Sequence, residues 1–365
     1  MTPDVLSAGP QELEALLEEA GQPRFRGRQL FRALWREGVA DYAAVTVWPK
    51  ALRTAMAQRA PWGRARCLAE QRSPDGTVKW LLAFPDGARV ETVLLPHDYG
   101  YSLCVSSQVG CAMGCTFCAS GLSGRLRNLT AGEMLEQVRF ANTYLAEADP
   151  GARVSRVDLM GSGEPLDNYT ATVRFLRLAH EPEGLGLSYR HMTVSTSGLA
   201  PRIRRLADEG LPVTLAVSLH AADDELRTRL MPVNQAYPLE AVMEAAAYYW
   251  RRTRRRVTFE YLLLRGLNDT PAQARQLVAL LRPLDGGAHV NLIPWNPVPE
   301  LPWQASTPAA AARFLDLVQA GGISCTIRKE FGRDIDAACG QLRRREEGMR
   351  DSQGLWVIPP RPGPG

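Results

Sequence analysis

The sequence predicts an α/β protein with a large parallel sheet, preceded by a small α+β module. From about residue 100 to residue 327, short apolar runs alternate with helical stretches, which is typical of parallel strands joined by helices. The first 65 or so residues carry apolar side chains at helical spacing instead. The alternation fits either a doubly wound sheet or a sheet that closes as a barrel.

The N-terminal module is predicted to contain helices and one β-hairpin. Leu13, Leu16 and Leu17 have helical spacing, and similar apolar spacing continues to Met56. Two β-rich runs, Trp80–Phe84 and Val90–Leu95, flank the turn Pro85-Asp86-Gly87 and predict the hairpin. We place the border of this module at residue 96.

The second part is predicted to hold seven strand runs and six main helices. The strand runs are Leu103–Val109, Val154–Met160, His191–Ser195, Val213–Leu219, Val257–Leu264, Val290–Pro294 and Ile323–Ile327. The helical stretches are Ala131–Leu145, Tyr169–Leu178, Pro201–Glu209, Leu239–Arg251, Pro271–Leu281 and Ala309–Ala320. In either topology, active-site residues lie at the C-terminal ends of the strands. We expect the Pro- and Gly-rich tail, residues 354–365, to be disordered.

Composition excludes several classes of protein. The chain has 365 residues, 45% of them apolar and 22% charged, which is ordinary for a globular protein and excludes intrinsic disorder, collagen and a disulfide miniprotein. Its length suggests two or three domains. We see no apolar run suited to a membrane span and no secretory signal, so we expect a cytoplasmic protein without membrane contact.

The charge is unevenly distributed. The net charge is +4, but residues 22–66 hold ten basic and two acidic residues, a local charge of +8. Only three of the 43 cations are lysine. Arginine stacks on bases and binds phosphates, so the segment is a candidate RNA contact. A solvated helical face and a GC-rich genome are the alternative explanations for the charge and for the arginine excess.

Three cysteines, Cys111, Cys115 and Cys118, follow a predicted strand with the spacing Cx3Cx2C. Structural zinc usually takes four ligands from two separated pairs, and the sequence has no second pair. Three thiolates suit a [4Fe–4S] cluster that leaves one iron free for another ligand. The spacing therefore favours a cluster over zinc or a chance grouping.

Several motifs together resemble the RlmN/Cfr family of the radical S-adenosylmethionine superfamily. They are Cx3Cx2C, Cys104–Cys111, Arg127–Thr130, Gly163–Leu166, Ser195–Gly198, Ser218–His220, Asn291–Pro297 and Asp334–Leu342. The resemblance implies a partial (β/α)6 TIM-like barrel over 97–332 and a C-terminal segment, 333–353, that carries a methyl-accepting cysteine. It implies one [4Fe–4S] cluster, S-adenosylmethionine, and methylation of adenosine C2 in 23S rRNA and of an adenosine in tRNA.

The resemblance also implies roles for individual residues. Cys339 would accept a methyl group, Cys104 would form a disulfide with it to release the product, and Glu91 would take the C2 proton. A radical route is chemically reasonable because the C2–H of adenine is neither acidic nor nucleophilic, and the cofactor supplies that chemistry. The implied cofactor-binding residues are Gly163, Glu164, Ser195, Ser218, Leu219, His220 and Asn296.

Two positions depart from the family pattern. Ser162 stands where the family usually has methionine, and Phe331 lies in a loop that is commonly more polar. Three other functions stay open: C8 methylation as in Cfr, another radical S-adenosylmethionine reaction, and a non-catalytic RNA-binding protein with a structural metal. We further expect a monomer that takes electrons from a donor such as flavodoxin.

Overall fold

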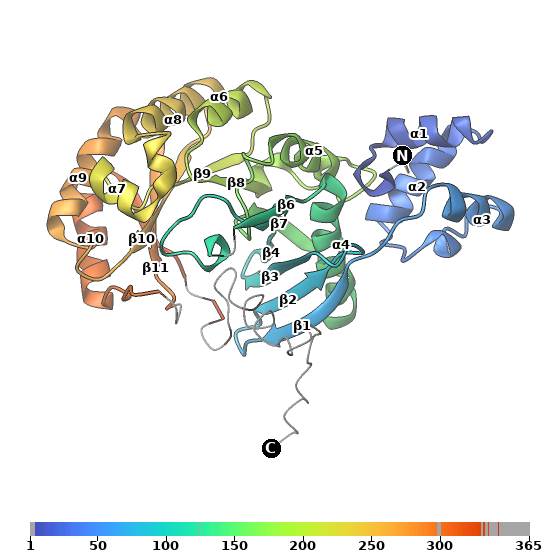
Figure 1. Ribbon diagram of the computed structural model, residues 1–365, viewed down its shortest axis with the longest axis horizontal. Coiled ribbons are helices and arrows are strands. Elements are labelled where there is room, and N and C mark those ends of the chain that lie inside the picture. Colours follow the sequence, from blue (N-terminus) through green and yellow to red (C-terminus); the bar gives the residue numbers. More distant parts are fainter. Residues whose placement is uncertain are drawn as a thin grey trace, which may run out of the picture.

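A computed structural model describes residues 4–122, 124–297, 301–329, 331–332, 335 and 342. Its largest feature is a ten-stranded sheet in the order β1-β2-β3-β4-β7-β8-β9-β10-β11-β12 (Figure 1). The four N-terminal strands pair antiparallel, and all pairs from β4 to β12 are parallel. In the described residues β1 and β12 do not pair, so the sheet is a partial barrel, as predicted.

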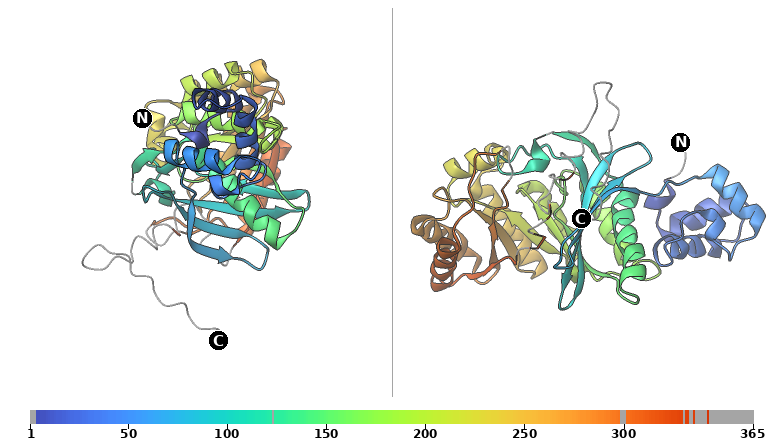
Figure 2. Two further views of the ribbon diagram at one scale, coloured as in Figure 1. Left: turned by 90° about the vertical axis from the view of Figure 1, so that its right-hand side faces the viewer. Right: turned by 90° about the horizontal axis from the view of Figure 1, so that it is seen from below.

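The N-terminal module is a lobe of helices at one end of the molecule (Figure 2). Its elements are η1 (Val5–Ser7), α1 (Pro10–Glu19), α2 (Phe25–Trp35), η2 (Tyr42–Ala44) and α3 (Lys50–Arg59). Helix α1 packs on α2, and the helices bury large apolar side chains such as Leu13, Phe31 and Trp48. The helical character predicted for this segment is therefore confirmed.

The antiparallel part of the sheet contains β1 (Arg66–Arg72), β2 (Val78–Ala83), β3 (Arg89–His97) and β4 (Gly100–Cys104). Strands β2 and β3 form the predicted hairpin, and β1 is an edge strand that the sequence analysis did not predict. Because β3 pairs with β4 and β4 with β7, hydrogen bonds run through the border proposed at residue 96.

Helices alternate with the parallel strands and follow one side of them (Figure 1). The strands are β7 (Val154–Leu159), β8 (Met192–Thr196), β9 (Thr214–Ser218), β10 (Val257–Leu263), β11 (Ala288–Pro294) and β12 (Ser324–Ile327). The helices are α4 (Ala131–Ala148), α5 (Tyr169–His180), α6 (Ala200–Asp208), α7 (Asp224–Leu230), α8 (Leu239–Thr253), α9 (Pro271–Leu281) and α10 (Pro308–Ala320). The short 3-10 helices are η3 (Ala119–Gly121), η4 (Tyr189–His191), η5 (Pro232–Gln235) and η6 (Arg282–Leu284).

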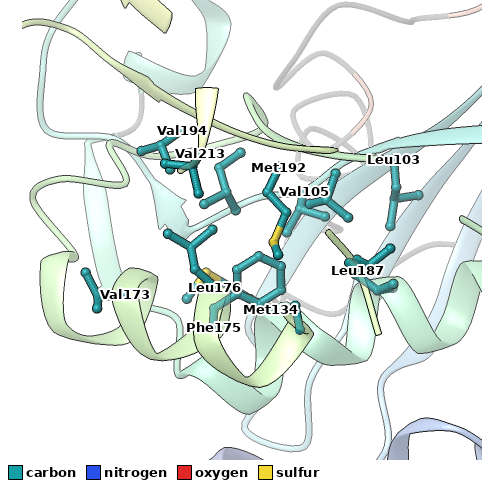
Figure 3. Close-up of a cluster of buried hydrophobic side chains, with 14 of the residues drawn as sticks. Leu103, Val105, Met134, Val173, Phe175, Leu176, Leu187, Met192, Val194 and Val213 are labelled. Atoms are coloured by element: carbon teal, nitrogen blue, oxygen red, sulfur yellow. The ribbon is translucent and has the colours of Figure 1, made fainter. Parts of the chain in front are cut away.

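The main core lies between the parallel strands and their helices. Figure 3 shows part of it, where Leu103, Val194 and Val213 meet Met134 of α4 and Phe175 of α5. These side chains are almost fully buried. Burial of a large aliphatic or aromatic side chain contributes about 1.5–3 kcal/mol to the stability of the fold. These contacts therefore hold the helices against the parallel strands.

The predicted strand Leu103–Val109 is wrong in its extent. Strand β4 ends at Cys104, and β5 (Gln108–Gly110) pairs instead with β6 (Arg125–Asn128) in a separate two-stranded sheet. The backbone N–H groups of Ser107 and Gln108 both donate to the carbonyl of Ser162, at 2.9 and 3.1 Å. The chain therefore leaves the large sheet to follow the loop after β7.

No helix in the described part of the chain is long and apolar enough to span a membrane.

Candidate functional site

One cavity lies beyond the carboxyl ends of β7, β8 and β9. It is lined by eight residues that the sequence analysis selected: Cys111, Cys115, Cys118, Gly163, Glu164, Ser195, Ser218 and His220. Parallel strands end at the same edge of the sheet, and this brings together residues that lie far apart in the sequence. Among the described residues, Leu219 and Asn296 do not line this cavity. Residue 339 lies outside the described residues.

The loop after β7 is packed against the segment that follows β4. Gly163 has φ +110°, and a Cβ atom there would lie 2.6 Å from Cβ and 2.7 Å from the backbone N of Gln108. The side-chain oxygen of Gln108 accepts from the N–H of Glu164 at 2.9 Å. Glycine is required here by the positive φ and by close backbone packing.

Glu164 is buried with its carboxylate directed toward backbone donors. Oε1 accepts from the N–H of Leu166 at 3.0 Å, and Oε2 accepts from the N–H of Ser197 at 2.6 Å. Burial raises the pKa of Glu164, while these two hydrogen bonds act to lower it. Side-chain hydrogen bonds from Thr196 and Ser197 act in the same direction. Because Glu164 also lines the cavity, its carboxylate is placed to attract a cationic ligand such as an ammonium group.

Ser162, one of the departures from the family pattern, joins this loop to the cysteine loop. Its hydroxyl lies 3.2 Å from the hydroxyl of Ser120, which belongs to η3 directly after Cys118. Both serines are buried. The hydroxyl that replaces the apolar methionine side chain therefore has a hydrogen-bond partner.

The cysteine loop is held between β5 and β6. At the base of this hairpin Gly110 has φ +78°, and a Cβ atom there would lie 1.9 Å from the carbonyl oxygen of Gly124. Two tryptophans outside the hairpin also bind this loop. The indole N–H of Trp295 donates to the carbonyl of Phe117, and that of Trp303 donates to the carbonyl of Thr116.

The three thiols share one environment. Burial raises the pKa of Cys111 to about 12, and the pKa of Cys115 is raised well above its usual value by burial and by the two neighbouring thiols. In the described residues no group of three or more His, Cys, Asp or Glu is placed to hold a single metal ion. A cluster is larger than one ion, and three thiols that line one cavity fit its ligand set.

His220 is held as a neutral imidazole at the edge of the cavity. It has φ +57°, and Nδ1 accepts from the N–H of Leu262 at 3.0 Å, which leaves the ring proton on Nε2. Burial and nearby Arg227 lower the pKa of His220 to about 3. Its ring also meets Phe117 edge-on, with centroids 4.7 Å apart. His220 can therefore act as a neutral donor but not as a cation.

Arg227 of α7 supports the site and was missed in the sequence analysis. Its guanidinium is fully buried and donates to the carbonyl of Ser197 at 2.7 Å and to that of Ser218 at 3.2 Å. It also donates to Leu219 and Asn234. This one side chain therefore joins the loops after β8 and β9, and no motif spacing indicated it.

Cys104 and Glu91 lie on the strands beside the cavity rather than in its lining. Cys104 is buried with Val93, and the partly buried Met160, which also lines the cavity, packs against them. Glu91 is 4% exposed and its Oε2 lies 3.0 Å from Nζ of the fully buried Lys79. Glu91 is therefore buried in an ion pair between β2 and β3 rather than exposed on its strand.

Phe331 packs against the same group. Its ring contacts the cluster around Cys104 and meets His97 edge-on, with centroids 5.0 Å apart. The N–H of Gly332 donates to Asp75 at 2.8 Å. The aromatic departure from the family pattern therefore brings the chain after β12 to the antiparallel strands, beside Cys104.

Two family models match the chain, the "Radical SAM superfamily" over residues 105–278 and the "Ribosomal RNA large subunit methyltransferase N-terminal domain" over residues 4–61. A protein of Symbiobacterium thermophilum, described as "Probable dual-specificity RNA methyltransferase RlmN", is 49% identical over 92% of this chain and 90% of its own length. This chain belongs to the RlmN family. Its members are radical S-adenosylmethionine enzymes, and an RlmN-family protein of Geobacillus kaustophilus with the same description is 46% identical over 94% of this chain and 93% of its own.

A solved structure supports the fold of this RlmN-family chain. The crystal structure of a radical SAM methyltransferase from Sphaerobacter thermophilus superposes with a TM-score of 0.88 at 46% identity, covering 92% of this chain and 98% of that one. The predictions of a radical S-adenosylmethionine barrel and of an enzyme are confirmed. The roles of individual residues stay predictions.

Proposed function

We propose that this chain methylates C2 of an adenosine in 23S rRNA, and an adenosine in tRNA, through a methyl group carried on Cys339. The observation that carries the proposal is the shared cavity of Cys111, Cys115, Cys118 and the Gly163-Glu164 turn, with Cys104 on the neighbouring strand. The family and the names of its members support an RNA substrate.

Each half of the cavity is assigned to one cofactor. Cys111, Cys115 and Cys118 would hold the [4Fe–4S] cluster, and Glu164 would bind the amino group of S-adenosylmethionine. The chemistry these groups supply when bound is the one-electron generation of a hydrogen-abstracting radical. Glu164 suits its role because a buried carboxylate with two backbone donors is fixed in orientation and gains from a cationic partner.

The chain's own groups would handle the proton and the carbon–sulfur bond. Glu91 would act as the base, and its Oε2 lies 3.0 Å from Nζ of Lys79, a contact that holds the carboxyl group in place. Residues 91 and 93 point to the same face of β3, and Val93 pairs with Cys104 on β4. A base and a thiol are thus presented side by side, as release of a methylated product from Cys339 through a disulfide with Cys104 requires.

Nucleoside analysis tests the proposal. The chain is expressed in a host that lacks its own enzyme, and rRNA and tRNA are digested and separated by mass spectrometry. We expect 2-methyladenosine in both RNAs. Detection of 8-methyladenosine alone would establish the C8 alternative, and no methylated adenosine would contradict both.

Variants test the thiol roles. Cys339→Ala should still cleave S-adenosylmethionine after anaerobic reconstitution but leave RNA unmethylated. Cys325→Ala is the matched control, because Cys325 is a buried thiol of β12 that lines no part of the cavity in the described residues. Retained methylation in Cys339→Ala would show another radical reaction or another methyl carrier.

A further inference from the structure

Helix α3 has two faces in contact with other parts of the molecule, and one of them lines a cavity. Its apolar side, Leu52 and Met56, is buried in the N-terminal module. A different face, spaced i, i+3, i+4 and i+7, lines a cavity of about 450 Å³, a size in the range of small-molecule pockets. The α3 residues on this face are Lys50, Arg53, Thr54 and Ala57. This cavity is separate from the cysteine-lined one.

The opposite wall of the cavity is aromatic and fixed. Tyr42 and Trp62 both line it, with ring centroids 3.8 Å apart. The hydroxyl of Tyr42 donates to the carbonyl of Ala60 at 2.9 Å, and Nε1 of Trp62 donates to that of Ala40 at 3.3 Å. Tyr42 is buried behind Trp62, so the apolar surface offered to a ligand is that of the partly buried Trp62, which the contact with Tyr42 and the hydrogen bond to Ala40 hold in place.

The cations of the module are unequally paired. Arg24 and Arg28 bind Glu14 of α1, at 3.3 and 2.6 Å, and Arg59 pairs with Glu19. Arg32 and Arg64 also have carboxylate partners. Glutamates of the acidic helix α1 therefore pair with three of the ten cations that the sequence places in residues 22–66.

Lys50 and Arg53 differ from those arginines. Within the described residues neither has a carboxylate partner, and the buried Nε of Arg53 has no hydrogen-bond partner. Arg53 donates through Nη1 to the carbonyl of Ala43. Asp41 is the one acid in the lining, and its Oδ1 already accepts from the N–H of Ala44. Against the one carboxylate of Asp41, these two cations give the lining of the cavity a net charge of +1.

We propose that this cavity binds an unpaired nucleobase of the RNA substrate, with the adjoining phosphate held by Lys50 and Arg53. Single-stranded RNA is recognised by stacking of bases on aromatic rings together with cationic contacts to the backbone, and both parts are present here. A purely apolar ligand would leave the cations unused. The inference rests on the proposed RNA substrate and adds a base-binding site distant in sequence from the cysteine loop.

A matched pair of α3 variants of the full chain tests the proposal. Ala57→Glu places a carboxylate in the cavity, whereas Ala55→Glu places the same group on an exposed position of α3 outside it. The probes are a fluorescein-labelled single-stranded RNA oligonucleotide of mixed sequence and its abasic counterpart. The wild type and Ala55→Glu should prefer the intact oligonucleotide by roughly tenfold. Ala57→Glu should lose that preference.

Equal preference for the intact oligonucleotide in Ala55→Glu and Ala57→Glu would overturn the proposal. Lys50→Ala leaves the cavity open. It should weaken the binding of both oligonucleotides and reduce the salt slope of binding by about 1. An unchanged slope would equally refute the phosphate contact. Thermal melting checks that each variant is folded.

Nucleoside analysis separates this inference from the proposed function. Suppose that the wild type methylates RNA and that Ala57→Glu keeps the preference for the intact oligonucleotide. This result would reject the base site and leave the proposed function standing. The predicted base preference without any RNA methylation would reject the function alone.

Discussion

Replacement of Gly163 by alanine should destabilise the fold through the loop that lines the cavity. Gly163 has φ +110°, a region that residues with a Cβ rarely adopt. The new Cβ would lie 2.6 Å from Cβ and 2.7 Å from the backbone N of Gln108, both well inside van der Waals contact. Since part of the obstruction is backbone, a side-chain rotation cannot relieve it.

The magnitude follows from two separate costs. A sparsely populated backbone conformation costs about 1–3 kcal/mol, and overpacking a filled interior costs about 1–3 kcal/mol more. Alanine also restricts the unfolded chain, which offsets about 0.4–1 kcal/mol. We therefore expect Gly163→Ala to lower the free energy of unfolding by about 3 kcal/mol, within a range of about 1–6 kcal/mol.

Gly151→Ala separates strain from collision. Gly151 has a similar φ of +98°, but a Cβ there would meet nothing within 4 Å. Strain acts at both positions and collision only at Gly163, so urea unfolding should show Gly163→Ala to be less stable than Gly151→Ala by about 2 kcal/mol. Equal losses would refute the claim that the segment around Gln108 constrains this loop.

Three further outcomes are expected from buried polar groups. Arg227→Met should lower the free energy of unfolding by about 3–5 kcal/mol, because several buried carbonyls lose their donor. Arg229 is exposed, so Arg229→Met should stay within about 0.5 kcal/mol of the wild type in the same urea titration. Burial raises the pKa of Glu260 to about 7 from 4.5, so the folded chain keeps a proton that the unfolded chain releases, and stability is lost as pH rises through this interval. Glu260→Gln should match the wild type near pH 4.5 and exceed its stability by about 3 kcal/mol above pH 7, and a constant difference across a pH series of unfolding curves would contradict this. Ser162→Ala should cost about 1 kcal/mol, the value of its bond to Ser120, and retain methylation in the nucleoside assay.

The parallel strands and their helices could be predicted because each carries a continuous apolar pattern. Strand β1 could not, because Arg66–Arg72 is mostly exposed at the edge of the sheet and has no buried face to produce a period of two. The end of β4 was also missed. Apolar Val105 and Val109 follow Cys104 in the sequence, but hydrogen bonds from Ser107 and Gln108 to the loop after β7 direct this segment out of the sheet. Local patterns do not record such long-range partners.

The same limit applies to the site. The predicted site residues that line the cavity belong to recognisable motifs, but the motifs do not show which contacts hold the loops in place. Gln108 accepts from Glu164 and also donates to Asn128 and Asp167, and Arg227 lies in a helix whose sequence looks like ordinary charged surface. The local charge of +8 over residues 22–66 was a misleading guide to exposed positive charge for a related reason. Local counting could not show that the acidic α1 neutralises arginines that follow it.

The arrangement of these supports explains how the cavity can be rigid although loops build it. The loop after β7 is bonded to the segment after β4 through Gln108, and the loops after β8 and β9 share Arg227. Glu164 then joins the first pair to the second, because its carboxylate accepts from Ser197. Each of these four segments is thus bonded to a buried polar side chain that also bonds a second segment, and satisfied buried networks of this kind confine side chains to one arrangement. A reaction that aims a radical at a single carbon depends on such positioning, since small displacements reduce the rate steeply. Arg227, which lies outside the motifs, would therefore contribute to catalysis as a positioning residue that holds the loops carrying Ser197 and Ser218.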